Sequence, residues 1–297
     1  MNKKEEKAIN RLSISDRVRT YLHHPGSLIL WLLVVIAAVA TLGVLFYLIG
    51  YILIHGIPYL TPNLFAWKYD SDNVSMMPAI INTILMTLIS LVIAVPFGIG
   101  SAIYLVEYAK RGNKLVSVIR VTAETLTGIP SIIYGLFGML FFVTYLKWGY
   151  SMIAGACTLA IMVLPVIMRT TEEALIAVPD SYREGSFGLG AGRLRTVFKI
   201  VLPAAVPGIM SGIILSIGRI VGETAALIYT SGTIADVALN PMNSGRTLAV
   251  HMYSLSREGL HTDQANATAV ILLIIVFLIN GISGLVSRKF IKGDETE

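Results

Sequence analysis

The sequence predicts an all-α integral membrane protein with six transmembrane helices and both chain ends in the cytoplasm. Of its 297 residues 55% are hydrophobic and only 14% are charged, and the mean hydropathy is +0.73. Such a composition excludes an ordinary soluble domain. Six apolar stretches reach the length of roughly 20 residues that a membrane-spanning helix needs. The basic residues, moreover, gather on one side of that arrangement, as cytoplasmic loops require.

The six predicted spans are joined by connections of unequal length, the longest being 169–202 on the cytoplasmic side and 232–266 on the outside. The first span is preceded by lysines and contains a small-residue cleavage pattern at 38–40, as a signal peptide would, but its apolar sequence continues well beyond that point. We therefore expect an uncleaved anchor. In the second span, Pro96 is tolerable where neighbouring helices satisfy the freed backbone groups. The predicted spans are 27–54, 79–106, 128–146, 150–168, 203–231 and 267–286.

The placement of lysine and arginine fixes the orientation. Eighteen of the 23 lie in segments assigned to the cytoplasm, four lie outside, and Arg219 lies within a span. The four outside are Lys68, Lys147, Arg246 and Arg257. The net charge of +5 therefore reflects membrane topology, and no soluble basic domain is present that would indicate nucleic-acid binding.

The chain reads as one membrane domain with additions at its ends. We expect a cytoplasmic N-terminal segment at 1–27, with a short surface helix at 11–22, and a first helix with its external loop at 28–78. The main membrane domain then covers 79–290, and a cytoplasmic tail covers 291–297. Cys157 is the sole cysteine, which excludes a disulfide within the chain and a cysteine metal site. The histidines show no metal-ligand spacing, so no metal site is predicted.

The cytoplasmic loop 172–203 is predicted to fold as helix, bend, helix. Pro179 and Asp180 suit the first turn of a helix, because proline lacks only an unused donor there and a carboxylate opposes the positive helix end. A flexible turn is then supplied by Gly188, Gly190 and Gly192. Apolar residues recur at helical spacing over 194–201. Such a knob between two membrane helices suits docking of a soluble partner, and an amphipathic loop at the lipid headgroups is the alternative.

Two ionisable residues lie inside the fifth predicted span. Arg219 and Glu223 are four apart, which on a continuous helix places them on one face. Charged residues at such depth usually face a bundle interior or a watery path. A guanidinium matches an oxyanion, and the carboxylate can hold or release it, so the pair is our candidate for a translocation path. The alternative is a structural ion pair.

Two further patterns are interpreted as structural. Arg120 and Glu124 repeat the four-residue spacing near the cytoplasmic boundary, where an exposed pair contributes about 0 to 1 kcal/mol. Small residues four apart in the fifth span allow close helix approach, within the chain or against a partner chain. These are Gly208 with Gly212 and Gly218 with Gly222.

The loop 172–203 also carries a family resemblance. Glu184 is followed by Gly190, Ile200, Leu202 and Pro203 at the spacing of the E-A-A-x3-G-x9-I-x-L-P loop of bacterial ABC-importer permeases, with glycine and serine in place of the two alanines. Longer stretches resemble the phosphate-specific importer permeases, and among them the PstA-type subunits. These stretches are INTILMTLISLVIAVPFGIGSAIYLVEYA, GIPSIIYGLFG, RTTEEALIAVPDSYREGSFGLGA and GRIVGETAALIYTSG.

The resemblance implies a multi-pass subunit of the bacterial plasma membrane, with the type I ABC importer permease fold. It implies a PstC-like second permease as heterodimer partner, a PstB-like ATPase dimer and a PstS-like phosphate-binding protein. The surrounding membrane lipid is a further contact of the chain. It also implies that the ATPase docks on Tyr182, Arg183, Glu184, Gly185, Ser186, Phe187 and Gly190. Since the chain contains no Walker A sequence, ATP and magnesium are used by the partner chain, and we expect no enzyme activity and no cofactor here.

Other readings of the same features stay open. The docking loop is shared with sulfate and molybdate permeases and with the PstC-type partner, so the loop alone does not select the solute. A membrane scaffold or sensor in phosphate signalling is a different class of function that also uses a cytoplasmic loop. It would bind a regulatory protein without moving solute.

Overall fold

The computed structural model describes residues 25–110 and 112–293, and these divide into two units, one that ends at Ile54 and one that begins at His55. The first unit consists of most of helix α2 (Pro25–Gly56), which covers the first predicted span. Within this chain none of its apolar span window is buried, as suits a helix whose side chains face lipid or another subunit. The predicted surface helix at 11–22 and the last residues of the tail, 294–297, lie outside the described residues.

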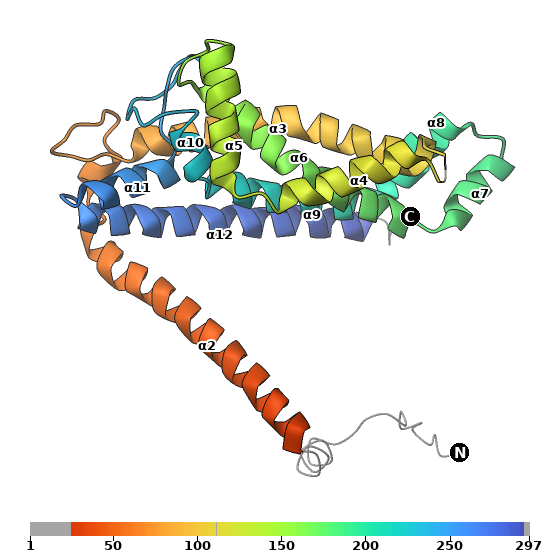
Figure 1. The fold of residues 1–297 in the computed structure, drawn as a ribbon, viewed down its shortest axis with the longest axis horizontal. Helices are drawn as coiled ribbons and strands as arrows, with labels where there is room; N and C mark the ends of the chain where they lie inside the picture. Colours follow the sequence, from red (N-terminus) through yellow and green to blue (C-terminus); the bar gives the residue numbers. More distant parts are fainter. Residues whose placement is uncertain (1–24, 111, 294–297) are drawn as a thin grey trace. The chain divides into compact units, whose positions relative to one another are not determined.

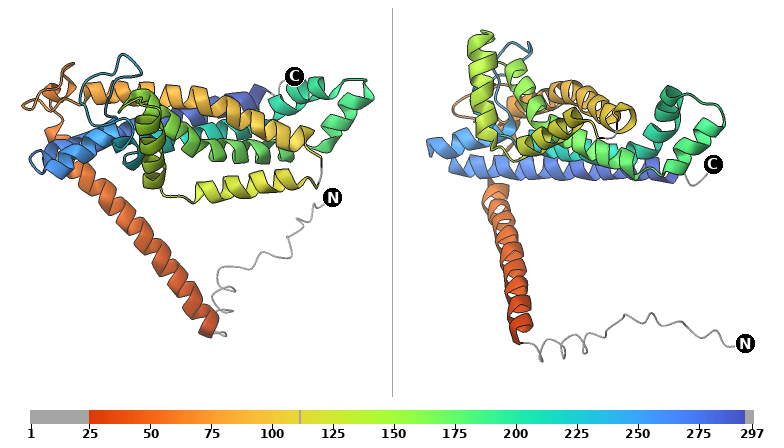
Figure 2. Two further views of the ribbon diagram at one scale, coloured as in Figure 1. Left: turned by 45° about the horizontal axis from the view of Figure 1, so that its top comes forward. Right: turned by 45° about the vertical axis from the view of Figure 1, so that its right-hand side comes forward.

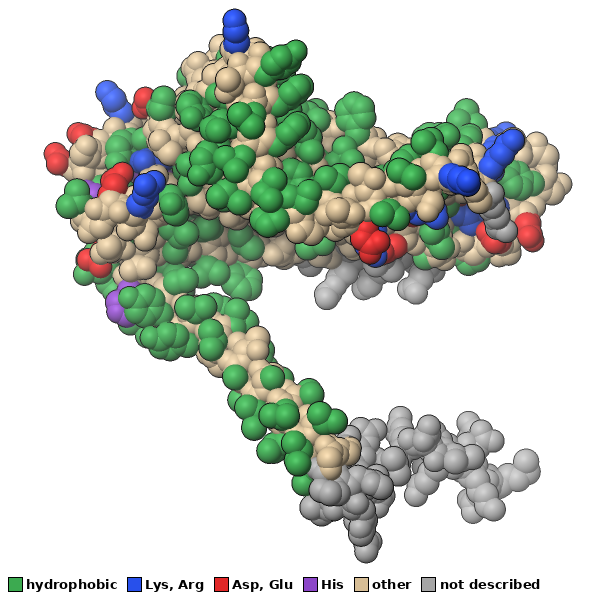
Figure 3. All heavy atoms as spheres, viewed as in Figure 1, with side chains coloured by type: hydrophobic (Ala, Val, Ile, Leu, Met, Phe, Trp, Pro, Cys, Tyr) green, Lys and Arg blue, Asp and Glu red, His purple; other side chains and the backbone are tan. Residues whose placement is uncertain are grey.

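Four long helices form the second unit and lie side by side (Figures 1 and 2). They are α3 (Met77–Ile103), α6 (Met152–Ala177), α9 (Leu202–Val221) and α12 (Thr262–Gly293). Helix α6 is the central one, since two thirds of its span window is buried and it packs against both α3 and α9. Its Leu159, Met162 and Ile167 contribute to the main core. In the view of Figure 3 the middle of the bundle is covered by hydrophobic side chains, while most charged ones lie towards its two ends.

The third predicted span, 128–146, corresponds to a helix over Ser131–Tyr145, and a separate helix precedes it. The structure has α4 (Lys114–Thr127) and α5 (Ser131–Gly138), which continues as a π-helix over Met139–Tyr145, and the two parts are bent by 104°. Gly128 and Pro130 lie at the bend; Pro130 disfavours helical backbone at the residue before it, so the helix ends there. The described chain thus has five helices that are long and apolar enough to cross a membrane, or six if the bent pair is one crossing.

Glycines allow α5 to lie close to its neighbours. A Cβ atom at Gly135 would lie 2.8 Å from the Cα of Ala226 in α10 (Ala225–Ile228), and one at Gly138 would clash with Thr158 of α6. Close packing therefore depends on the absence of side chains at these two positions.

Short helices complete the two ends of the bundle. One end carries α11 (Leu248–Glu258) and two 3-10 helices, Ile57–Tyr59 and Pro62–Phe65. The other carries a π-helix at Tyr104–Tyr108 that continues α3, the hairpin of α7 (Asp180–Gly188) and α8 (Arg193–Thr196), and a second π-helix at Val197–Val201 that leads into α9. The six-span, all-helical fold class is confirmed, with one span bent.

Candidate functional site

The predicted helix-bend-helix of the cytoplasmic loop is confirmed. Helix α7 begins at Asp180 with Pro179 just before it, and it ends at Gly188. Gly190 follows with φ +82°, in the left-handed region that favours glycine. Its N–H donates to the Phe187 carbonyl (2.9 Å), and the next N–H, of Ala191, donates to the Ser186 carbonyl (3.1 Å). This pair of bonds is a Schellman cap, which ends α7 and turns the chain towards α8.

Arg183 fixes α7 to the membrane bundle. Its Nε and Nη2 donate to Glu107 Oε1 at 3.1 and 2.8 Å, and it also donates to the carbonyls of Leu175 and Val178 at the end of α6, both at 2.8 Å. Asp180 lies 3.2 Å from Nη1. The Arg183 and Glu107 side chains are only 14% and 8% exposed, so this is a buried, charge-assisted brace that links three segments.

The seven residues of the predicted ATPase-coupling group separate into two kinds. Arg183 and Ser186 point inward; the Ser186 hydroxyl lies 2.8 Å from that of Thr196 in α8, and both are buried. The others are exposed: Tyr182, Glu184, Gly185, Phe187 and Gly190. Further apolar side chains on the same hairpin are also exposed, namely Leu189, Leu194 and Phe198. The hairpin therefore has a braced inner face and an open outer face with apolar and charged side chains.

A polar cavity of about 910 Å³ lies beside the hairpin, between α7 and the segment that joins α3 to α4. The Arg193 guanidinium, which also lines it, lies 5.5 Å from the Tyr108 ring, a cation–π contact. The cavity contributes a mostly polar flank to the open outer face.

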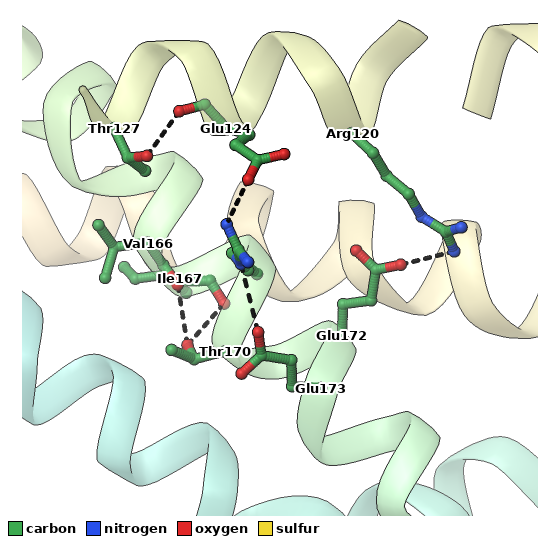
Figure 4. A network of polar contacts seen from close by, with 9 residues as sticks. Arg120, Glu124, Thr127, Val166, Ile167, Thr170, Glu172 and Glu173 are labelled. Carbon is green, nitrogen blue, oxygen red and sulfur yellow. Dashed lines mark hydrogen bonds and ion pairs between the residues drawn. The ribbon is translucent and has the colours of Figure 1, made fainter. Parts of the chain in front are cut away.

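The predicted pair of Arg120 and Glu124 is wrong. Each residue instead bridges from α4 to α6 (Figure 4). Arg120 Nη2 lies 2.6 Å from Glu172 Oε1, and Arg169 Nη1 lies 3.5 Å from Glu124 Oε1. The same Arg169 also pairs with Glu173 at 3.2 Å. Spacing along one helix could not reveal these partners, because they belong to another helix.

Arg219 and Glu223 do not share a helix face. Helix α9 ends at Val221, and Glu223 lies beyond the break, where its Oε1 accepts a hydrogen bond from the Ala226 N–H at 3.2 Å. The one-face prediction is therefore wrong, and so is the structural ion pair in this conformation. Within the described chain Arg219 has neither an ion pair nor a hydrogen-bond partner, and it is partly exposed.

The two glycine pairs of the fifth span also differ. A Cβ at Gly208 would lie 2.6 Å from that of Ala174, and one at Gly212 would clash with Thr170, so this pair packs against α6. Nothing outside the helix lies within 4 Å of a Cβ at Gly218. The Gly218 side of α9, next to Arg219, is therefore open.

Sequence reasoning missed Glu107 and Glu172, the acidic partners that become buried. Glu107 follows an apolar run, and only its position inside a helix that continues to Tyr108 marked it as unusual. No group of residues in the described chain has the composition of a metal site.

Comparison with known proteins connects this geometry to a family. Residues 94–292 match the family described as "Binding-protein-dependent transport system inner membrane component". The chain is 34% identical over 251 residues to a probable ABC transporter permease protein, YqgI, of Bacillus subtilis, with 78% of this chain and 85% of the relative covered. It is 35% identical over 229 residues to the phosphate transport system permease protein PstA of Pasteurella multocida, with 76% and 81% covered.

A solved structure shows the same fold. A bacterial alginate ABC transporter in complex with its periplasmic protein aligns with TM-score 0.67 over 91% of this chain and 98% of that chain, at 15% identity. At such identity the likeness shows the fold alone. Together with the family match, it establishes that the chain belongs to the inner-membrane components of binding-protein-dependent transport systems, as a multi-pass, non-catalytic permease subunit of an ABC importer whose ATPase is a separate chain.

Proposed function

We propose that this permease subunit imports inorganic phosphate, driven by a separate ATPase. The support is that relatives 34–36% identical carry the name of phosphate transport system permease protein PstA. By the same reasoning the partners are a PstC-like permease, a PstB-like ATPase dimer that uses ATP and magnesium, and a PstS-like phosphate-binding protein.

Within the structure, the proposal is supported by the unpaired charge of Arg219. It is a permanent cation at the end of α9, it has no carboxylate partner among the described residues, and the neighbouring Gly218 leaves the helix surface open. An unpaired guanidinium inside a membrane domain is costly unless water or an anion reaches it. We assign Arg219 to the translocation path, with Glu223 as a buried carboxylate that holds the break after α9.

The hairpin of α7 and α8 would transmit the movement of the ATPase. Its outer face offers Tyr182, Phe187 and the acidic Glu184 to a partner, and its inner face is tied to α3 and α6 by Arg183. A push on the outer face therefore reaches the membrane helices through a buried ion pair and not through a loose loop. Glu184→Lys should uncouple ATP hydrolysis from uptake without changing the fold.

The test is uptake of labelled phosphate in cells that lack this chain and in the same cells after its restoration. Sulfate and molybdate, the other oxyanions that such permeases carry, are measured in parallel. Loss and recovery of phosphate uptake alone would support the proposal. Unchanged phosphate uptake during phosphate starvation, with no other phosphate transporter present, would contradict it, and loss of sulfate or molybdate uptake would assign the cargo instead.

A further inference from the structure

The end of the second unit opposite α7 holds a buried polar cluster made of Arg246, Thr247 and His251, here called the outer cluster. Arg246 ends the loop that follows α10, Thr247 directly precedes α11, and His251 lies one turn into that helix. Their exposed fractions are 5%, 2% and 0%. Figure 1 shows α11 and α7 at opposite ends of the bundle.

The backbone of the outer cluster is held rigidly by α3. Asn82 Nδ2 donates to the Arg246 carbonyl at 3.2 Å, and Thr83 Oγ1 accepts the Leu248 N–H at 2.8 Å. The Arg246 N–H donates in turn to the Ile234 carbonyl at 2.9 Å. The three side chains of the cluster are thus positioned by packed helices and not by a free loop.

The side chains of the cluster, in contrast, lack partners. Within the described chain, Arg246 Nε and Nη2 and Thr247 Oγ1 are buried without a hydrogen bond. The ring nitrogens of His251 are also buried, and the ring faces the Val74 backbone. The Arg246 guanidinium lies 4.5 Å from the centre of the Tyr69 ring, but a cation–π contact leaves the N–H groups in the guanidinium plane unused. Buried polar groups without partners are rare and costly, and here several of them converge.

The groups that lack partners include the hydrogen-bond donors that an oxyanion would accept from. Nε and Nη2 form one edge of the guanidinium, and the same edge of Arg183 is filled by Glu107. Burial and the charge of Arg246 lower the pKa of His251 to about 3, so its ring is neutral near pH 7 and offers one N–H donor. The Thr247 hydroxyl and the positive end of α11 add to this arrangement.

The segment between Tyr69 and Val74 covers the cluster. Tyr69 lies over Arg246 and meets the His251 ring edge-on, with ring centres 6.2 Å apart. Val74 is 2% exposed and has φ +47°, a left-handed conformation that a β-branched residue rarely adopts. Strain of this kind concentrates at segments with a functional role, which suits a cover that moves when a ligand enters.

We propose that Arg246, Thr247 and His251 form a binding site for a tetrahedral oxyanion at the outer end of the bundle, closed in this conformation by the 69–74 segment. The site uses residues separate from Arg219. It does not depend on which oxyanion the importer carries, because phosphate, sulfate and molybdate share the charge and acceptor geometry that these groups recognise.

The test titrates the purified full chain in lipid nanodiscs with inorganic phosphate, sulfate or chloride at constant ionic strength. Thermal stability gives the affinity, and hydrogen exchange over 66–76 reports the cover locally. We expect saturable stabilisation by phosphate or sulfate but not by chloride, with altered exchange in the cover. Arg246→Gln should weaken the affinity at least tenfold, while Arg257→Gln, at an exposed arginine in α11, should leave it unchanged.

Thr247→Val keeps the test decisive if Arg246→Gln does not fold. This change removes only a hydroxyl that has no partner, so the chain should remain stable while the oxyanion affinity falls several-fold. Unchanged affinity in Thr247→Val and in a folded Arg246→Gln, or no saturable effect of either oxyanion on the unaltered chain, would overturn the proposal. Uptake measured separately distinguishes the two proposals: oxyanion binding that depends on Arg246 without phosphate uptake contradicts only the cargo.

Discussion

The two ends of the bundle use buried arginine in opposite ways. At the end with α7, Arg183 fills its donors with Glu107 and two carbonyl groups, and the result is a rigid brace. At the end with α11, Arg246 is buried more deeply, but its corresponding edge has no partner among the described residues. A buried cation therefore stabilises the fold only where the protein supplies its anion. Where the protein supplies none, as at Arg246, we expect a bound anion to take that place.

The largest loss of stability is expected when the brace between Arg183 and Glu107 is broken. Arg183→Gln leaves Glu107 buried without its cation, which should lower the free energy of unfolding by about 3–5 kcal/mol. Thermal melting of the purified chain in detergent measures it. Arg195→Gln, at an exposed position of the same hairpin, is the matched control. Equal melting temperatures for the two variants would show that the brace carries no stability.

Acidification tests the opposite end. The pKa of His251 is lowered from 6.5 to about 3 in the folded chain, so below pH 6.5 the unfolded state binds a proton that the folded state does not. Stability should therefore fall as pH decreases from about 6.5 towards 3, by up to about 1.4 kcal/mol per pH unit from this group. The free energy of unfolding is measured between pH 7.5 and 5 in the unaltered chain and in His251→Gln. It should fall less steeply with decreasing pH in His251→Gln. An identical slope in both chains would contradict a buried, neutral His251.

The bridges between α4 and α6 give a graded test of pairing. Arg120→Gln leaves the buried Glu172 without its partner and should cost about 1–3 kcal/mol, whereas Arg169→Gln removes pairs between exposed side chains and should cost clearly less. Chemical unfolding of the two variants side by side measures the difference. A larger loss in Arg169→Gln would mean that burial does not govern these bridges.

The smallest effect concerns the turn that ends α7. Gly190→Ala places a Cβ on a left-handed residue and should destabilise the chain by about 1 kcal/mol, although the surrounding space is open. Gly185→Ala, inside α7 and also in open space, should be neutral or stabilising by up to about 1 kcal/mol. Melting temperatures that change in the same direction for both would argue against the helix cap as the cause.

The parts of the fold that could be predicted were those with a local signal. Apolar length revealed five crossings, and proline, an acidic first turn and closely spaced glycines revealed the hairpin of α7 and α8. Helix α4 and its bend to α5 were missed because the basic Lys114 and Arg120 assign 114–127 to the cytoplasmic side on sequence alone, so the third span was expected to begin only at Gly128.

The candidate sites were predicted less well, because their partners come from distant segments. Arg120 and Glu124 each pair with α6, and Arg183 pairs with Glu107, which lies 76 positions away. The four-residue spacing of Arg219 and Glu223 implied a shared face only if the helix continued, and it ends between them. Arg246 could not be recognised from sequence at all, since only burial distinguishes it from the other external basic residues.

The most direct test of the account is phosphate uptake, together with ATP hydrolysis, by the assembled importer that carries Arg219→Gln, with Arg219→Lys alongside. An unpaired cation that serves the anion path should be required for uptake and not for folding. We predict that uptake falls at least tenfold in Arg219→Gln and recovers in part in Arg219→Lys, while melting temperature and membrane level stay those of the unaltered chain. Unimpaired uptake in Arg219→Gln would remove Arg219 from the path and contradict the account.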